Sequence, residues 1–167
     1  MMRYFHAALL VAVLLPGCAS YDGRGLVPGT ATAADVETLM GQPAERLAKA
    51  DGGSVLYYPR GPAGRDSYAV LLGSDGRLQA IEQRLTDANL AKIMPGSTTA
   101  RQVRELLGPQ PTSSYLTRQA RDVWEYKMGD GSTPYILWVQ FSGDGIVREV
   151  IKMKDPAEDA NSGPGLP

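Results

Sequence analysis

The sequence predicts an α+β fold of two tandem repeats, each with a short helix-loop-helix packed on one face of a three- to four-stranded antiparallel sheet. The first observation is a duplication: residues 28–41 return as residues 95–108, with seven of the 14 aligned positions identical. The second is that apolar residues at helical spacing follow the Pro-Gly pair in both copies. The third is that a two-residue period then takes over in each repeat.

Each repeat contains one clearly marked helix. Thr32 and Thr99 are each followed, three positions later, by a side chain that can complete a capping box. Apolar residues then fall at i, i+3 and i+4, which gives each helix one apolar face. Gly41 and Gly108 end the two helices, because glycine most easily adopts the backbone conformation that follows a helix.

A second helix is predicted for the helix-loop-helix, and it is better marked in the second repeat. There Thr86-Asp87 can cap a short helix through residues 90–94, and Pro95-Gly96 turns the chain into the next helix. In the first repeat only Leu26-Val27 stands at the equivalent place, so that helix is short or missing.

The alternating segments predict three antiparallel strands in each repeat. The connections are too short for parallel crossovers, and Asp75-Gly76 and Asp144-Gly145 suit tight hairpins. Residues 112–117 are a candidate fourth strand of the second sheet, whereas their counterpart, residues 44–50, looks more helical. The predicted strands are 55–58, 67–72 and 78–83 in the first repeat, and 122–127, 135–141 and 146–152 in the second.

The N-terminus predicts a secreted and lipidated protein. Residues 7–15 form an unbroken apolar run, too short for a membrane span of about 20 residues but suited to a signal peptide. The following Leu15-Pro16-Gly17-Cys18 resembles the bacterial lipobox, and Cys18 is the only cysteine in the chain. We expect residues 1–17 to be removed and Cys18 to carry the lipid anchor. The alternative is an ordinary signal peptide with a cysteine nearby by chance.

The expected mature chain has few residues suited to catalysis. Loss of residues 1–17 removes His6, the only histidine, and acylation of Cys18 removes the only thiol. Ser-His-Asp and Cys-His catalysis and zinc sites with His or Cys ligands are therefore excluded. Of the 17 basic residues only Arg3 is lost, against 18 acidic residues, so no basic surface for nucleic acid is indicated. We expect no cofactor, no metal, no nucleic acid and no enzymatic activity.

The remaining boundaries follow from composition. Residues 18–27 are short and polar and would form the lipidated N-terminus and a tether. Residues 28–85 and 86–154 would be the two repeats. Residues 155–167 contain three prolines and no aromatic residue, so they cannot bury enough apolar surface to fold, and we expect a disordered tail.

Several motifs of the second repeat stand at a characteristic spacing. They are Pro95-Gly96-Ser97-Thr98, Gln102-Val103, Leu107-Gly108, Trp124-Glu125-Tyr126, Val139-Gln140-Phe141 and Asp144-Gly145. This pattern resembles that of the SmpA/OmlA (BamE-like) family of outer-membrane lipoproteins. Because no aspartate follows Cys18, the lipobox resemblance also implies the outer membrane, with the protein facing the periplasm. The family resemblance implies an accessory or scaffold role in β-barrel protein assembly, with the β-barrel assembly complex as partner.

The tandem arrangement supports a second interpretation. It resembles the β-lactamase inhibitor protein, whose two repeats also combine a helix-loop-helix with a sheet. That resemblance implies a module that binds or inhibits another periplasmic protein. An assembly factor would alter the permeability of the outer membrane when mutated, whereas an inhibitor would not.

Two pairs of residues are candidates for partner or anion binding. Arg60 and Arg65 flank a Gly/Pro-rich turn and could grip a phosphate or a partner carboxylate, or could simply keep a hairpin soluble. Ile136 and Trp138 alternate with Leu137 and so should face away from the helices, as an interface anchor or under a covering loop or the other repeat. Trp124, in the neighbouring strand, is expected to face the core.

Overall fold

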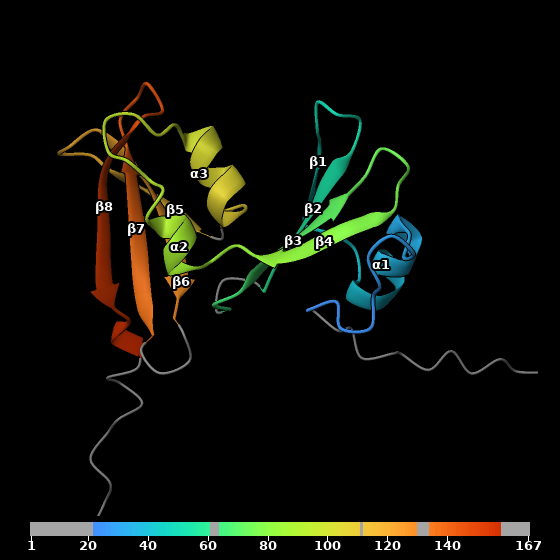
Figure 1. The fold of residues 1–167 in the computed structure, drawn as a ribbon. Helices are drawn as coiled ribbons and strands as arrows, with labels where there is room; N and C mark the ends of the chain where they lie inside the picture. Colours follow the sequence, from blue (N-terminus) through green and yellow to red (C-terminus); the bar gives the residue numbers. More distant parts are fainter. Residues whose placement is uncertain (1–21, 61–63, 111, 130–133, 158–167) are drawn as a thin grey trace, which may run out of the picture.

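The computed structural model describes residues 22–60, 64–110, 112–129 and 134–157. It shows a helix followed by four strands twice, with a further short helix at the start of the second unit (Figure 1). The first unit, residues 22–85, contains α1 (Ala33–Met40), β1 (Glu45–Ala48), β2 (Ser54–Pro59), β3 (Ser67–Leu72) and β4 (Leu78–Gln83). The second unit, residues 86–157, contains α2 (Asp87–Leu90), α3 (Ala100–Leu107), β5 (Thr112–Leu116), β6 (Arg121–Met128), β7 (Tyr135–Phe141) and β8 (Val147–Lys154).

Each unit is built around a four-stranded antiparallel sheet whose strands lie in chain order. The six strands expected from alternation are present, and the candidate strand at residues 112–117 is confirmed as β5. The helix caps are also confirmed, because Thr32 and Thr99 both form capping boxes. Each cap residue is tied to the last hairpin of its own sheet, Thr32 opposite Arg77 and Thr99 opposite Ile146. Equivalent local sequence therefore places α1 and α3 equivalently over their sheets.

The prediction of a helix-loop-helix in each repeat is wrong, because most of the regular structure is sheet. In the described part of the first unit α1 is the only helix, and the chain before it forms turns, with the Ala31 N–H donating to the Val27 carbonyl at 2.9 Å. In the second unit α2 is one turn of four residues with no buried side chain. A single turn forms too few hydrogen bonds to be stable alone, so neither unit carries a full helical pair.

The helical interpretation of residues 44–50 is also wrong, because β1 occupies their middle. Glu45 lies opposite Tyr57 and Leu47 opposite Val55, and the Ala44 N–H donates to the Tyr57 carbonyl at 2.9 Å. These are contacts with a strand further along the chain. They outweigh the modest helix propensity of a short Ala- and Leu-containing segment.

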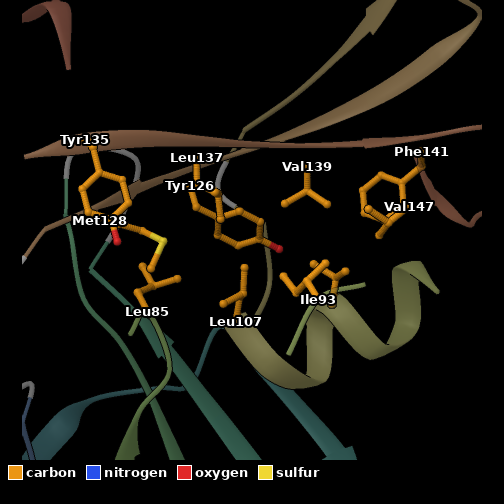
Figure 2. Close-up of a cluster of buried hydrophobic side chains, with 11 residues drawn as sticks. Leu85, Ile93, Leu107, Tyr126, Met128, Tyr135, Leu137, Val139, Phe141 and Val147 are labelled. Carbon is orange, nitrogen blue, oxygen red and sulfur yellow. The ribbon is translucent and has the colours of Figure 1, made fainter. Parts of the chain in front are cut away.

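The core of the second unit lies between α3 and one face of the second sheet (Figure 2). Val103 and Leu107 of α3 pack with Tyr126, Leu137 and Val139, all at most 1% exposed. Burial raises the pKa of the Tyr126 hydroxyl well above its usual value, and this hydroxyl donates to the Gly108 carbonyl at 3.2 Å. The corresponding core of the first unit is formed by α1 and the facing side chains of β2, β3 and β4.

The two units touch through α3, which Figure 1 shows on the side of the second sheet that faces the first unit. Arg104 of α3 donates from Nε and Nη2 to Glu45 Oε2 of β1, at 3.1 and 2.5 Å. Gly108, at the end of α3, lies against Ser67 and Tyr57. We name this side of the first sheet, opposite α1, the rear face; it carries Glu45, Leu47, Val55, Tyr57, Ser67, Ala69 and Leu71.

Candidate functional site

The expected lipid anchor, Cys18, lies outside the described residues, as do residues 1–17 and 158–167. Among the residues that the structure describes, no helix is long and apolar enough to cross a membrane. The anchor therefore stays a prediction from the sequence.

The structure places the two candidate arginines in ion pairs. Arg60 Nη1 lies 3.5 Å from Asp66 Oδ2, six residues later in the chain. Arg65 reaches the second unit, where Nη2 lies 3.0 Å from Asp155 Oδ2 and Nη1 donates to the Met128 carbonyl at 3.3 Å. Arg65 thus joins the two units, a role that its sequence neighbourhood does not indicate. Binding of an external anion by this pair stays a prediction, and residues 61–63 between them lie outside the described part.

Asp155, which the sequence assigns to the start of the tail, is only 1% exposed. The Ala157 backbone N–H, and after it the Arg65 guanidinium, hold the pKa of the Asp155 carboxyl below its usual value. A carboxyl with a lowered pKa in the folded state stabilises the fold above its unfolded pKa of about 3.9, and the contribution is lost as the pH falls through the folded pKa.

We therefore expect Asp155→Asn to lower the melting temperature near neutral pH and to have progressively less effect below about pH 4. Circular dichroism melts of the mature protein across this range measure the effect. Asp122→Asn, at an exposed position of β6, is the matched control and should change the melting temperature little. If Asp155→Asn lowered the melting temperature by the same amount at neutral pH and below about pH 3, the stabilisation would not come from this carboxylate.

The other two candidates, Ile136 and Trp138, lie on the face of the second sheet opposite α3, as predicted. We name this the outer face. Residues 135, 137, 139 and 141 of β7 enter the core, and the alternate side chains of β7 point the other way. The outer face carries Val123, Glu125, Ile136, Trp138, Gln140 and Ile151, placed together by the pairing of β6, β7 and β8.

The two residues differ in what they offer to a partner. Ile136 is 8% exposed and therefore supports the face rather than presenting a contact. Trp138 is half-buried, and its Nε1–H donates to Glu125 Oε2 at 2.9 Å. Arg121 Nη1 donates to Gln140 Oε1 at 3.0 Å on the same face. The polar groups beside the indole are thus already bonded, which leaves a fixed aromatic surface that loses little freedom when covered.

Trp124 faces the opposite way, as predicted. It packs against the core cluster and its ring centroid is 4.6 Å from that of Phe141, with the planes tilted by 56°. It is half-buried at the border of the core rather than enclosed. The two tryptophans therefore lie on opposite faces of the same sheet.

The described residues contain no group that could hold a metal ion through three or more His, Cys, Asp or Glu side chains. Burial also raises the pKa of the tyrosine hydroxyls at the cores, that of Tyr58 to about 12. These hydroxyls stay protonated at neutral pH and are poorly matched to acid–base catalysis, which works best with a pKa near the operating pH.

A groove of about 780 Å³, not predicted from the sequence, lies between the rear face of the first sheet and α3. Leu47, Val55 and Leu71 form part of its lining, and Glu105 and Leu106 of α3 form another part. One sequence pattern could have indicated that the rear face of the first sheet is covered. Residues 55–58 and 67–72 are apolar on both faces, a pattern typical of strands that are covered on both sides.

Comparisons of the chain with models of protein families, with curated proteins and with solved structures find no match.

Proposed function

We propose that this protein is a non-enzymatic lipoprotein that binds another protein through the outer face of its second sheet. In this proposal Cys18 anchors it in the outer membrane and the folded units face the periplasm. The observation that carries the binding function is the position of Trp138, a half-buried aromatic side chain on a sheet face where neither α2 nor α3 packs. Aromatic side chains held in place by neighbours supply much of the binding energy at protein interfaces.

The biological setting of this proposal is β-barrel protein assembly, with the β-barrel assembly complex as partner. It rests on the resemblance of the second repeat to the SmpA/OmlA pattern. The outer face is compatible with a scaffold role, since it is built from the strands themselves and its polar side chains are internally bonded, such as Trp138 to Glu125. A rigid face of this kind binds without reorganising.

The test is recovery of the intact lipoprotein from crosslinked membranes, with wild type compared with Trp138→Ala. We expect wild type to recover the β-barrel assembly complex. Trp138→Ala should weaken the interaction by about 2 kcal/mol, or roughly thirtyfold in affinity. Tyr115→Ala is the matched control, because Tyr115 is a 57% exposed aromatic residue that pairs with Asp122 on the α3 side of the sheet. Cys18→Ser, which removes the anchor, should abolish fractionation with membranes.

Two results would contradict the proposal. If wild type and Trp138→Ala recover the assembly complex equally, the outer face is not the binding surface. Recovery of a lone soluble periplasmic enzyme in place of the assembly complex would favour the inhibitor-like interpretation.

A further inference from the structure

The groove between the units combines an apolar floor with a basic end. Its floor is the rear face of the first sheet. Its wall is the side of α3 that carries Arg101, Gln102, Glu105 and Leu106. α3 and the second sheet separate this groove from the outer face, so the groove does not involve Trp138.

The floor is a continuous aliphatic row across three strands. Leu47 of β1 lies opposite Val55 of β2, and Val55 lies opposite Leu71 of β3. All three are half-buried, whereas Tyr57, two residues after Val55 on the same face, is 2% exposed. Side chains at directly opposite positions in adjacent strands are about 5 Å apart, so this row spans roughly 10 Å. An extended peptide can set two side chains, spaced two residues apart, on a row of that length.

Arg84 and Lys92 form the basic end of the groove, and Asn89 connects them. Asn89 Oδ1 accepts from Lys92 Nζ at 2.9 Å, and Asn89 Nδ2 donates to the Arg84 carbonyl at 3.1 Å. The Arg84 side chain is 17% exposed and pairs through Nη2 with Glu82, but its buried Nε has no hydrogen-bond partner among the described residues. The buried Nε is out of reach of a ligand, so an incoming carboxylate would meet the exposed part of this guanidinium.

The lining as a whole is positive. Its cationic side chains are Lys49, Arg84, Lys92 and Arg101, and its carboxylates are Asp51 and Glu105. Each carboxylate is already paired within the lining, Asp51 with Lys49 at 2.8 Å and Glu105 with Arg101 at 2.9 Å. Arg84 and Lys92 have no partner among the lining carboxylates. Arg84 pairs with Glu82 outside the lining, so among the described residues Lys92 is the lining cation without an ion pair.

We propose that this groove binds a short extended segment of a partner protein that carries a carboxylate beside aliphatic side chains. The aliphatic side chains lie on the Leu47–Val55–Leu71 row and the carboxylate meets Arg84 and Lys92. A flat lipid surface fits less well, because the aliphatic row lies in a groove between the first sheet and α3. The inference is independent of the outer face and goes beyond the proposed function.

The test uses three fluorescein-labelled peptides of about ten residues, titrated into the mature protein by fluorescence anisotropy. One alternates leucine with glutamate, one leucine with lysine, and one serine with glutamate. We expect only the leucine–glutamate peptide to bind well, and more weakly at high salt, since the charged rim is partly exposed. The double variant Arg84→Gln/Lys92→Gln should weaken binding about tenfold or more, the scale expected for charge-assisted hydrogen bonds.

Further variants separate binding from folding. Lys92→Gln alone changes one exposed side chain and should weaken binding severalfold without altering the circular dichroism spectrum. Arg24→Gln/Arg118→Gln removes the same charge at exposed positions outside the groove and should leave binding unchanged. Trp138→Ala should also bind the peptide as wild type does, so failure of the proposed function and failure of this inference are distinguishable.

The proposal is overturned if Arg84→Gln/Lys92→Gln and Lys92→Gln bind the leucine–glutamate peptide as tightly as wild type. If the serine–glutamate peptide binds as tightly as the leucine–glutamate peptide, the groove is a general anion site. If the leucine–lysine peptide does so, the groove is a purely apolar site. Binding of phosphatidylglycerol vesicles that is lost in the same variants would assign the groove to lipid instead. Each of these results would also contradict the proposal that the groove binds a segment with a carboxylate beside aliphatic side chains.

Discussion

Replacing Phe141 with alanine is expected to destabilise the second unit by about 3–5 kcal/mol, a large share of the stability of a small domain. Phe141 is 2% exposed in the core cluster and supports Trp124, whose ring centroid is 4.6 Å away. Its removal creates a cavity and withdraws the neighbour of a tryptophan that is itself only half-buried. Urea unfolding of the mature protein, followed by fluorescence and circular dichroism, measures the loss.

Trp138→Ala is the matched comparison, since Trp138 lies in the same strand on the opposite face. We expect it to cost about 1 kcal/mol or less, because the side chain is half-buried and its main polar contact is one hydrogen bond to Glu125. The loss of stability for Trp124→Ala should fall between those for Phe141→Ala and Trp138→Ala. Large and equal losses for Phe141→Ala and Trp138→Ala would mean that Trp138 is part of a core, which would remove the outer face as an accessible surface.

The elements that sequence patterns predicted correctly are those whose causes are local. Thr32 and Thr99 cap their helices through side chains three residues away, and the alternation in residues 135–141 reports directly which residues of β7 face the core. These signals lie within one turn or one strand. They are therefore readable without knowing the rest of the chain.

The elements that the sequence did not reveal depend on contacts between distant residues. β1 is a strand because Leu47 and its neighbours pair with β2, which outweighs the helix propensity of the segment. Arg65 is bonded to Asp155, 90 positions away in the chain. The groove needs the rear face of one unit and α3 of the other at the same time, so no single repeat encodes it. Spacing within a repeat cannot predict such contacts between repeats.

The two units also differ in a way that duplication alone does not predict. The rear face of the first sheet is covered in part by α3, whereas the equivalent outer face of the second sheet carries no helix among the described residues. α3 therefore has two packed sides. Val103 and Leu107 enter its own core, and Arg104 pairs with Glu45 of the first unit. The equivalent helix α1 contributes Val36 and Met40 to a single core.

This difference predicts unequal effects for the same substitution at two equivalent glycines. Gly41 and Gly108 end α1 and α3 with nearly the same backbone, φ of 84° and 87° and ψ of −169° and −177°. Only glycine adopts this conformation readily, so alanine at either site should cost about 1–3 kcal/mol. A Cβ at Gly41 would meet nothing within 4 Å, whereas a Cβ at Gly108 would lie 2.7 Å from Ser67 Oγ of the first unit.

We therefore expect Gly108→Ala to destabilise the protein by about 1 kcal/mol or more beyond Gly41→Ala, since the added methyl overpacks the contact between the units. The Ser67 hydroxyl is buried without a hydrogen-bond partner in the described structure, so Ser67→Ala alone should be neutral or slightly stabilising. Combined with Gly108→Ala it should recover most of the excess loss, because it removes the atom that the methyl meets. Chemical unfolding of the four variants measures these differences. Equal losses at Gly41 and Gly108, with no coupling to Ser67, would show that the end of α3 does not rest on the first sheet in solution, and the groove between them would then lose its wall.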